Sequence, residues 1–205
     1  MIENQLTYTT TIKEKHNLTA ILVQSAQKET AKSNNVTATD YPNDYIQTIS
    51  GGTVTKGASD KTQWSIASYL ARVQYSYSGK YMLSAAIRTD GSSRFGKNNR
   101  WGYFPSASAA WRISEEDFFK KQKALSFIND MKLRVSYGVT GNFQIGNYEH
   151  LATMSNDNYI LGTGQGGLVY GYKPDNIERE DLSWEKNKMV NAGIDLQMFN
   201  GLLGV

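Results

Sequence analysis

The chain has 205 residues, a formal net charge of +3 and no cysteine. Without cysteine there is no disulfide and no thiol chemistry, and His16 and His150 have no cysteine to join them in a zinc site, so we expect no metal. The basic residues are scattered rather than grouped, which excludes a nucleic-acid-binding signature. No run approaches the roughly 18 apolar residues of a transmembrane helix. The first ten residues lack the basic and apolar regions of a secretory signal peptide.

Apolar and polar residues alternate with a period of two along most of the chain, which predicts β-strands. In 64–77, for example, Val73 and Tyr75 share one face, and Arg72 and Gln74 share the other. The alternation predicts an all-β fold of about seven strands, mostly antiparallel. In chain order they are expected at 4–12, 17–29, 64–77, 81–88, 106–113, 131–139 and 190–198.

The connections between these strands alternate in length. Segments 13–17 and 78–80 are short, whereas 30–63, 89–104 and 140–183 are long. In an antiparallel sheet the long connections therefore gather at one end, and recurrent loops above about 12–15 residues need a functional reason. The intermediate segment 114–130 is expected to contain a short helix, with Ser114 as its N-cap and acidic residues in its first turn.

Two architectures produce strands of this kind, and on pattern alone both remain open. A soluble β-sandwich that binds carbohydrate would bury the apolar faces against each other. An outer-membrane barrel would point them into lipid, line its lumen with polar residues and keep long loops on one side. The pattern favours the barrel, because one face repeatedly carries cations that would face the lumen: Arg72, Arg88, Arg112, Lys132 and Arg134. Aromatic residues also stand near both ends of the strands, where a bilayer has its interfaces: Tyr75, Tyr77, Tyr81, Trp101, Tyr103, Phe104 and Trp111.

Two motifs have the spacing of sites with other chemistry, but the residues around them do not support such sites. Residues 162–167 have the spacing GxGxxG, but no helix is expected to begin there, so we do not predict nucleotide binding. The acidic run 115–117 is better explained by the first turn of a helix than by acid–base catalysis. We therefore expect neither an enzyme nor a cofactor.

Several long motifs resemble the barrel of SusC/RagA-type TonB-dependent transporters. These are "RTDGSSRFGKNNRWGYFPSASAAWRISEEDFF" (88–119), "FINDMKLRVSYGVTGNFQIGNYEH" (127–150) and "LSWEKNKMVNAGIDLQMFNG" (182–201). The stretch "HNLTAILVQSAQKE" (16–29) is also similar, although Gln24 and Ser25 stand where the family usually has Gly. The resemblance implies an antiparallel transmembrane β-barrel of about 22 strands, with long extracellular loops and one short periplasmic helix in this segment.

The same resemblance implies a function and partners. Members import oligosaccharides or peptides across the outer membrane, with energy from the TonB complex and with a SusD-like surface lipoprotein over the barrel mouth. Residues 1–205 would be a partial barrel domain without plug domain, signal peptide and C-terminal strands, and we expect that this chain does not transport alone. Aromatic residues in the long outer loops can stack on sugars, so the candidate substrate contacts are Tyr41, Tyr45, Tyr159, Tyr170 and Tyr172.

Overall fold

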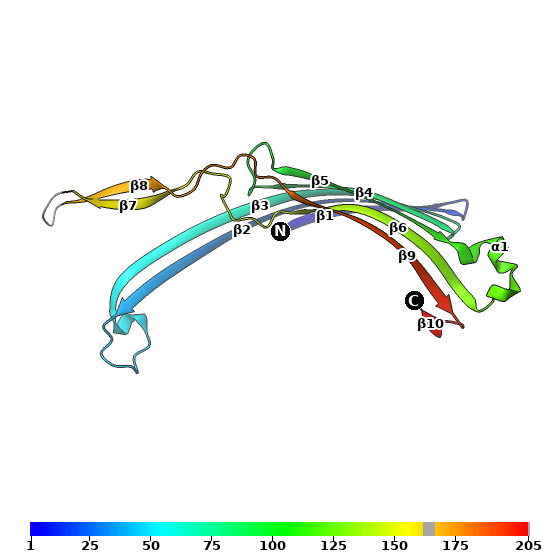
Figure 1. Ribbon diagram of the computed structural model, residues 1–205, viewed down its shortest axis with the longest axis horizontal. Helices are drawn as coiled ribbons and strands as arrows, with labels where there is room; N and C mark the ends of the chain where they lie inside the picture. The colour runs from blue at the N-terminus through cyan, green and yellow to red at the C-terminus, as the bar shows by residue number, and fades with distance from the viewer. Residues whose placement is uncertain (162–166, 205) are drawn as a thin grey trace.

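The computed structural model describes residues 1–161 and 167–204, and antiparallel strands dominate it (Figure 1). The strands are β1 (Ile2–Ile12), β2 (His16–Thr39), β3 (Thr53–Tyr77), β4 (Tyr81–Ser92), β5 (Trp101–Arg112), β6 (Ile128–Asn142), β7 (Met154–Ile160), β8 (Leu168–Pro174), β9 (Glu185–Met198) and β10 (Leu203–Gly204). The helical pieces are α1 (Asp117–Lys120) and the 3-10 turns η1 (Ile49–Gly51), η2 (Ile113–Glu115) and η3 (Lys123–Leu125).

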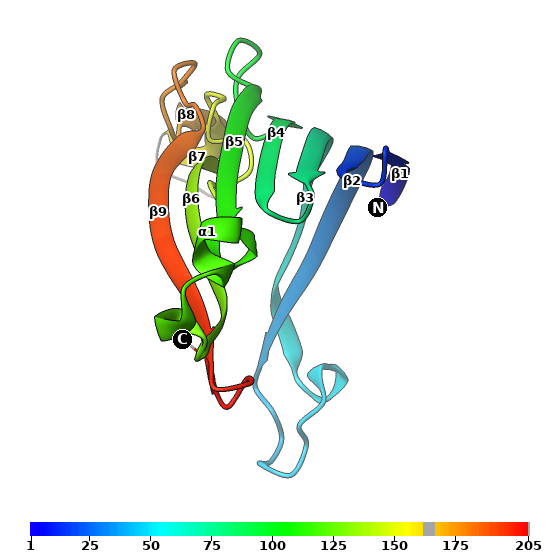
Figure 2. The ribbon, with the colours of Figure 1, turned by 90° about the vertical axis from the view of Figure 1, so that its right-hand side faces the viewer.

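One curved sheet contains most of these strands (Figure 2). It has eight strands in the order β1-β2-β3-β4-β5-β6-β9-β10, and β7 and β8 form a separate hairpin. In the part of the chain that the structure describes, the sheet does not close on itself and no second sheet packs against it. The fold is therefore a barrel segment, not the β-sandwich that the sequence left open. The seven predicted strands lie in β1–β6 and β9, apart from Ile113 at the end of one of them.

The strand register sorts the side chains into two faces with different chemistry. One row across β3–β6 pairs Tyr75, Leu83, Ala109 and Val135 in turn. The adjacent row, one residue along each strand, is Gln74, Ser84, Ser108, Ser136 and Asn191. Successive side chains of a strand point to opposite faces, so the sheet has an apolar face and a polar face.

Short turns close one end of the sheet, which we call the turn end. Residues Ser78 and Gly79 both have positive φ, and the Lys80 N–H donates to the Tyr77 carbonyl at 2.9 Å. Two consecutive residues with positive φ make a type I′ turn, which matches the twist of paired strands. Residues 13–14 and 199–200 repeat this geometry at the same end.

The opposite, loop end differs from expectation in two ways. Strands β2 and β3 continue as a paired ribbon through residues that we expected in a loop, from Thr30↔Gln63 to Thr39↔Thr53. The long connection 140–183 contains the β7–β8 hairpin, which projects away from the main sheet (Figure 1). The ribbon segment is rich in Ser, Thr, Asn and Lys, and the hairpin segment is rich in Gly and Tyr. They therefore lack the alternation that reveals a strand with one buried face.

The helix predicted in 114–130 is a single turn flanked by 3-10 turns. Ser114 does not cap it: the N-cap is Glu116, and the Ser114 hydroxyl donates to Asp130 Oδ1 at 2.7 Å. No helix in the described part of the chain is long and apolar enough to cross a membrane.

Candidate functional site on the polar face of the sheet

An open hollow of about 400 Å³ lies on the polar face toward the loop end. Its lining includes Arg72, Arg88 and Asp90 from β3 and β4, together with Phe104, Phe143 and Trp184. Charged groups thus meet aromatic rings in one concavity, which is the combination that binds an amphipathic polar ligand.

The charges in the hollow are only partly compensated. Asp90 is buried, and its two carboxylate oxygens share the single N–H of Arg88 Nε, at 2.9 and 2.8 Å. These residues are two positions apart on one strand, so they share a face. Arg72 has no ion-pair partner among residues 1–161 and 167–204, which leaves one guanidinium available to an anionic group.

The main apolar core of the described residues includes part of the aromatic wall of the hollow and one ring packed behind that wall. It consists of Phe95, Phe104, Val139 and Trp184, all buried. Trp184 packs 5.1 Å from the Phe95 ring and 5.2 Å from the Phe104 ring, centroid to centroid, and its Nε1 donates to the Arg100 carbonyl at 2.9 Å. Each of these contacts joins segments that are distant in sequence, so the wall holds the loop end together.

Phe104 was grouped with the interface aromatics, and the structure places it elsewhere. It is 5% exposed, whereas Tyr103 is 58% exposed. Phe104 alternates with Tyr103 along β5, and its backbone pairs with Arg88 on the polar face. Phe104 therefore belongs to the wall of the hollow. Val139, expected on the apolar face, is also part of this wall.

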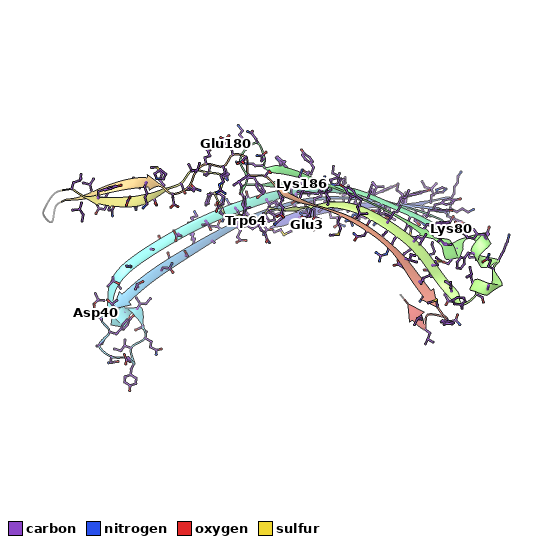
Figure 3. The ribbon with its side chains drawn as sticks, viewed as in Figure 1. Glu3, Asp40, Trp64, Lys80, Glu180 and Lys186 are labelled. Carbon is purple, nitrogen blue, oxygen red and sulfur yellow. The ribbon has the colours of Figure 1, made fainter. Side chains whose placement is uncertain are left out.

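A second set of contacts fastens the loop 93–100. The Arg94 guanidinium lies over Trp64, 4.8 Å from the ring centroid, and over Phe143 at 5.4 Å. Arg94 Nε donates to Asn147 Oδ1 at 2.9 Å, and His150 Nδ1 lies 3.0 Å from the Arg94 carbonyl. Trp64 and Glu180 mark this loop end in Figure 3, with Lys80 at the opposite end. The connection 89–104 was expected to be a long loop, but Ser92 and Phe95 within it are the most buried side chains of the described residues.

The other three predicted lumen cations lie at the turn end, outside the hollow. Lys132 and Arg134 share the Asp195 carboxylate, with N–O distances of 2.9 and 3.0 Å. Arg112 Nε lies 3.3 Å from Asp130 Oδ1, but no hydrogen bond to it is formed, so the contact is electrostatic. These ion pairs connect β6 to β9 and β5 to the start of β6, which suits them to a structural role.

The aromatic residues of the turn end form a row on the apolar face. Tyr77 and Tyr81 stack with centroids 6.4 Å apart, and Tyr81 and Trp111 stack at the same distance. Tyr75 stands beside the row, and its hydroxyl lies 2.8 Å from His16 Nδ1. At the loop end Tyr69 and Trp101 stack at 6.1 Å. Six of the seven predicted interface aromatics thus lie on the apolar face near its two ends.

Glu116 connects this row to the helical turn. Its Oε1 accepts from the Tyr81 hydroxyl at 2.7 Å and from Trp111 Nε1 at 3.1 Å, and Lys80 Nζ lies 3.2 Å from Oε2. The hydrogen bond from Tyr81 and then that from Trp111 lower the pKa of Glu116. The acidic run that resembled a catalytic pair therefore anchors aromatic side chains.

The five candidate substrate tyrosines do not form one cluster. Tyr41 and Tyr45 lie in the segment between β2 and β3, and the other three lie on the β7–β8 hairpin, which Figure 1 shows well apart from it. Within the hairpin, Tyr170 and Tyr172 share a face, and Tyr159 lies on the other. All five are exposed. Their role in substrate contact stays a prediction.

The described residues contain no group of three or more His, Asp or Glu side chains that could hold a metal ion. Of the GxGxxG motif, 162–166 lie outside the described residues.

Residues 3–205 match the family model described as "TonB dependent receptor-like, beta-barrel". The chain belongs to this TonB-dependent receptor barrel family. TonB-dependent receptor P39 of Formosa agariphila is 38% identical over 99% of this chain and 19% of its own length. TonB-dependent receptor SusC of Bacteroides thetaiotaomicron is 38% identical over 68% of this chain and 14% of its own length. The chain thus spans about a fifth or less of these relatives.

Solved structures agree with this membership. A chain of the RagAB peptide transporter superposes with a TM-score of 0.86 at 28% identity, over 98% of this chain and 22% of that chain. A RagAB peptide importer in the closed-closed state gives a TM-score of 0.85 over the same fractions. The chain is therefore a SusC/RagA-type outer-membrane barrel segment. In such a barrel the apolar face contacts lipid, the polar face lines the lumen and the short turns are periplasmic.

The residues that build the hollow were largely missed by sequence reasoning. Arg72 and Arg88 were found because they occupy the polar positions of strands in which apolar and polar residues alternate. Asp90 and Phe143 lie in stretches rich in Gly and polar residues, and Trp184 lies in a charged stretch, so no periodicity points to burial. The available signal was the Gly close to Phe104 and Phe143 in the sequence, which indicates close packing of backbone against these rings.

Proposed function

We propose that this chain forms part of the barrel wall of a TonB-dependent transporter that imports oligosaccharides or peptides. The observation that carries the proposal is the match of residues 3–205 to the receptor barrel, together with the superposition on a protein described as a peptide importer. The relatives are about five times as long or more. The plug, the contact with the TonB complex and barrel closure would therefore come from outside these residues.

The hollow on the lumen face has a volume of about 400 Å³, which suits part of an oligosaccharide or of a peptide. The half-buried ring of Phe143 suits the apolar face of a sugar ring, and Arg72 suits a carboxylate of a peptide or an acidic sugar. Nothing in this arrangement requires chemistry on the substrate, and the relatives are receptors. We therefore propose transport without catalysis and without a cofactor.

A SusD-like surface lipoprotein is the proposed partner. The support is the similarity to SusC and to a chain of the two-component RagAB importer. Such a partner would sit at the loop end, where the β2–β3 ribbon and the β7–β8 hairpin extend beyond the remaining strands (Figure 1).

Uptake by intact cells tests the transport proposal. Cells that lack the full polypeptide should lose uptake of labelled oligosaccharides or of labelled peptides, and a strain without a functional TonB complex should lose the same uptake. The lipoprotein should copurify with the tagged receptor. Unchanged uptake of both substrate classes in the deletion strain would contradict the proposal. Substrate uptake by proteoliposomes that contain only these 205 residues would contradict the expectation that the chain does not transport alone.

A further inference from the structure

A groove with a small-residue floor crosses the apolar face between two ridges. We call it the alanine trough: its floor is Ala85, Ala107 and Ala109, and its volume is about 530 Å³. The ridges are built by larger side chains of the neighbouring strands, which include Val73, Leu83, Val135 and Tyr137. Ala107 and Ala109 belong to the stretch "SASAA" of β5. All side chains of this stretch are small, although the strand lies between two neighbours with larger side chains.

Strand register explains why the trough is both deep and apolar. Ala107 pairs with Ala85 on one side and with Tyr137 on the other, so two consecutive small residues adjoin a large ring. The serines that alternate with the alanines belong to the row that faces the lumen. The groove therefore presents hydrocarbon and backbone to the bilayer, with few groups that could recognise a polar ligand.

The trough ends at the aromatic row of the turn end. A second hollow of about 370 Å³ continues it past Ala109 to Tyr81 and Trp111. Both rings donate hydrogen bonds to Glu116, which fixes their polar ends at the periplasmic side. From Trp111 to Ala107 a strand rises about 14 Å. Because barrel strands tilt by about 35–45°, this corresponds to a depth of about 10 Å, roughly two thirds of the hydrocarbon of one leaflet.

We propose that the alanine trough seats one acyl chain of a phospholipid from the periplasmic leaflet. The trough lies on the lipid-contacting face, it is lined by apolar groups, it begins at the level of the interfacial aromatic residues and it extends through most of the periplasmic leaflet. These properties match a lipid tail and exclude a sugar or an ion. The proposal rests on the membrane location of the barrel and is independent of the transported substrate.

Photolabelling of the full receptor tests this seat. The receptor is purified in mild detergent with phosphatidylethanolamine that carries a diazirine midway along one acyl chain, and labelled peptides are identified by mass spectrometry after irradiation. Labelling should concentrate on 105–111 and 133–137. Ala107→Phe should reduce it several-fold, because the ring fills the space of the acyl chain and removes the van der Waals contacts that hold the chain in the trough.

Ala20→Phe is the matched control, because Ala20 is another alanine of the apolar face and lies across Val73 from the trough. It should leave the labelling of 105–111 unchanged. An unchanged heat-dependent shift of the receptor on SDS gels shows that each variant has kept the barrel fold. Labelling that is spread evenly over the apolar face, or that Ala107→Phe leaves unchanged, would show annular lipid only and overturn the proposal.

Discussion

Glycines beside aromatic rings decide how closely the loop end packs. A Cβ on Gly102 would lie 2.9 Å from Trp184 Cγ and would overlap the Phe104 ring, and a Cβ on Gly141 would overlap the same ring. No real Cβ tolerates such contacts without a shift of its neighbours. These positions are glycine because the rings of the hollow occupy the space of a side chain.

We expect Gly102→Ala to destabilise the folded receptor by about 1–3 kcal/mol, the usual cost of overpacking a core. Gly138→Ala is the matched control: it lies on the lumen face of β6, and its Cβ would meet only Ser106 Cβ at 3.7 Å, an ordinary contact. Denaturant unfolding of both variants in detergent, followed by tryptophan fluorescence, measures the difference. Equal stability of the two variants would contradict the packing described for Phe104 and Trp184.

The carboxylate of Glu116 makes the stability of the turn end depend on pH. Its lowered pKa means that the folded state favours the carboxylate. The resulting stability is fully present above the unfolded-state pKa of about 4.3 and is lost as the pH falls through the lower folded-state pKa. Glu116→Gln should therefore be less stable than the wild type near neutral pH, and the difference should shrink as the pH falls from the unfolded-state pKa of about 4.3 through the lower folded-state pKa.

Thermal unfolding of both proteins from neutral to acidic pH measures this effect. Glu115→Gln is the control, because Glu115 pairs only with the exposed Lys120 at 2.6 Å and receives neither aromatic hydrogen bond. It should show little difference from the wild type. A constant gap between Glu116→Gln and the wild type across the whole range would show that the carboxylate charge does not matter.

At the scale of elements, the strands that cross the bilayer could be predicted and the segments beyond it could not. A strand with lipid on one face and a polar lumen on the other must alternate, and β3 through β6 do. The β2–β3 ribbon from residue 30 to 63 meets water on both faces, so nothing in its sequence distinguishes it from a loop. The loop 93–100 differs from expectation for another reason: its Arg94 and Phe95 are fixed by Trp64, Phe143 and Trp184, which lie far away in the sequence.

Arg94 should therefore control the order of two loops at once. Arg94→Lys keeps the charge but loses the planar group over Trp64 and Phe143 and the Nε bond to Asn147. We expect a loss of about 1–2 kcal/mol of local stability, seen as faster hydrogen exchange in both 93–100 and 143–150. Lys97→Ala, an exposed position in the same loop, should change neither segment. Faster exchange confined to 93–100 would contradict the coupling.

The whole molecule is organised by two solvents rather than by a core between layers. Lipid covers one face of the sheet and the lumen lies against the other. The sequence carried this information in its alternation, which is why face assignments succeeded for strands, whereas the hollow depended on distant loops. Adjacent residues near the middle of β4 should therefore respond in opposite ways to the same change.

Ala85 and Ala86 provide that comparison. Ala85 pairs with Val73 and Ala107 on the lipid face, whereas Ala86 pairs with Arg72 and Ser106 on the lumen face. Ala85→Lys should cost about 2–4 kcal/mol, because a charge near the bilayer midplane loses its hydration. Ala86→Lys keeps its ammonium in the polar lumen, where repulsion from Arg72 should cost no more than about 1 kcal/mol. Folding of the full receptor into vesicles, titrated with denaturant, measures both changes. Equal costs would contradict the assignment of the two faces, and a larger cost at Ala86 would reverse it.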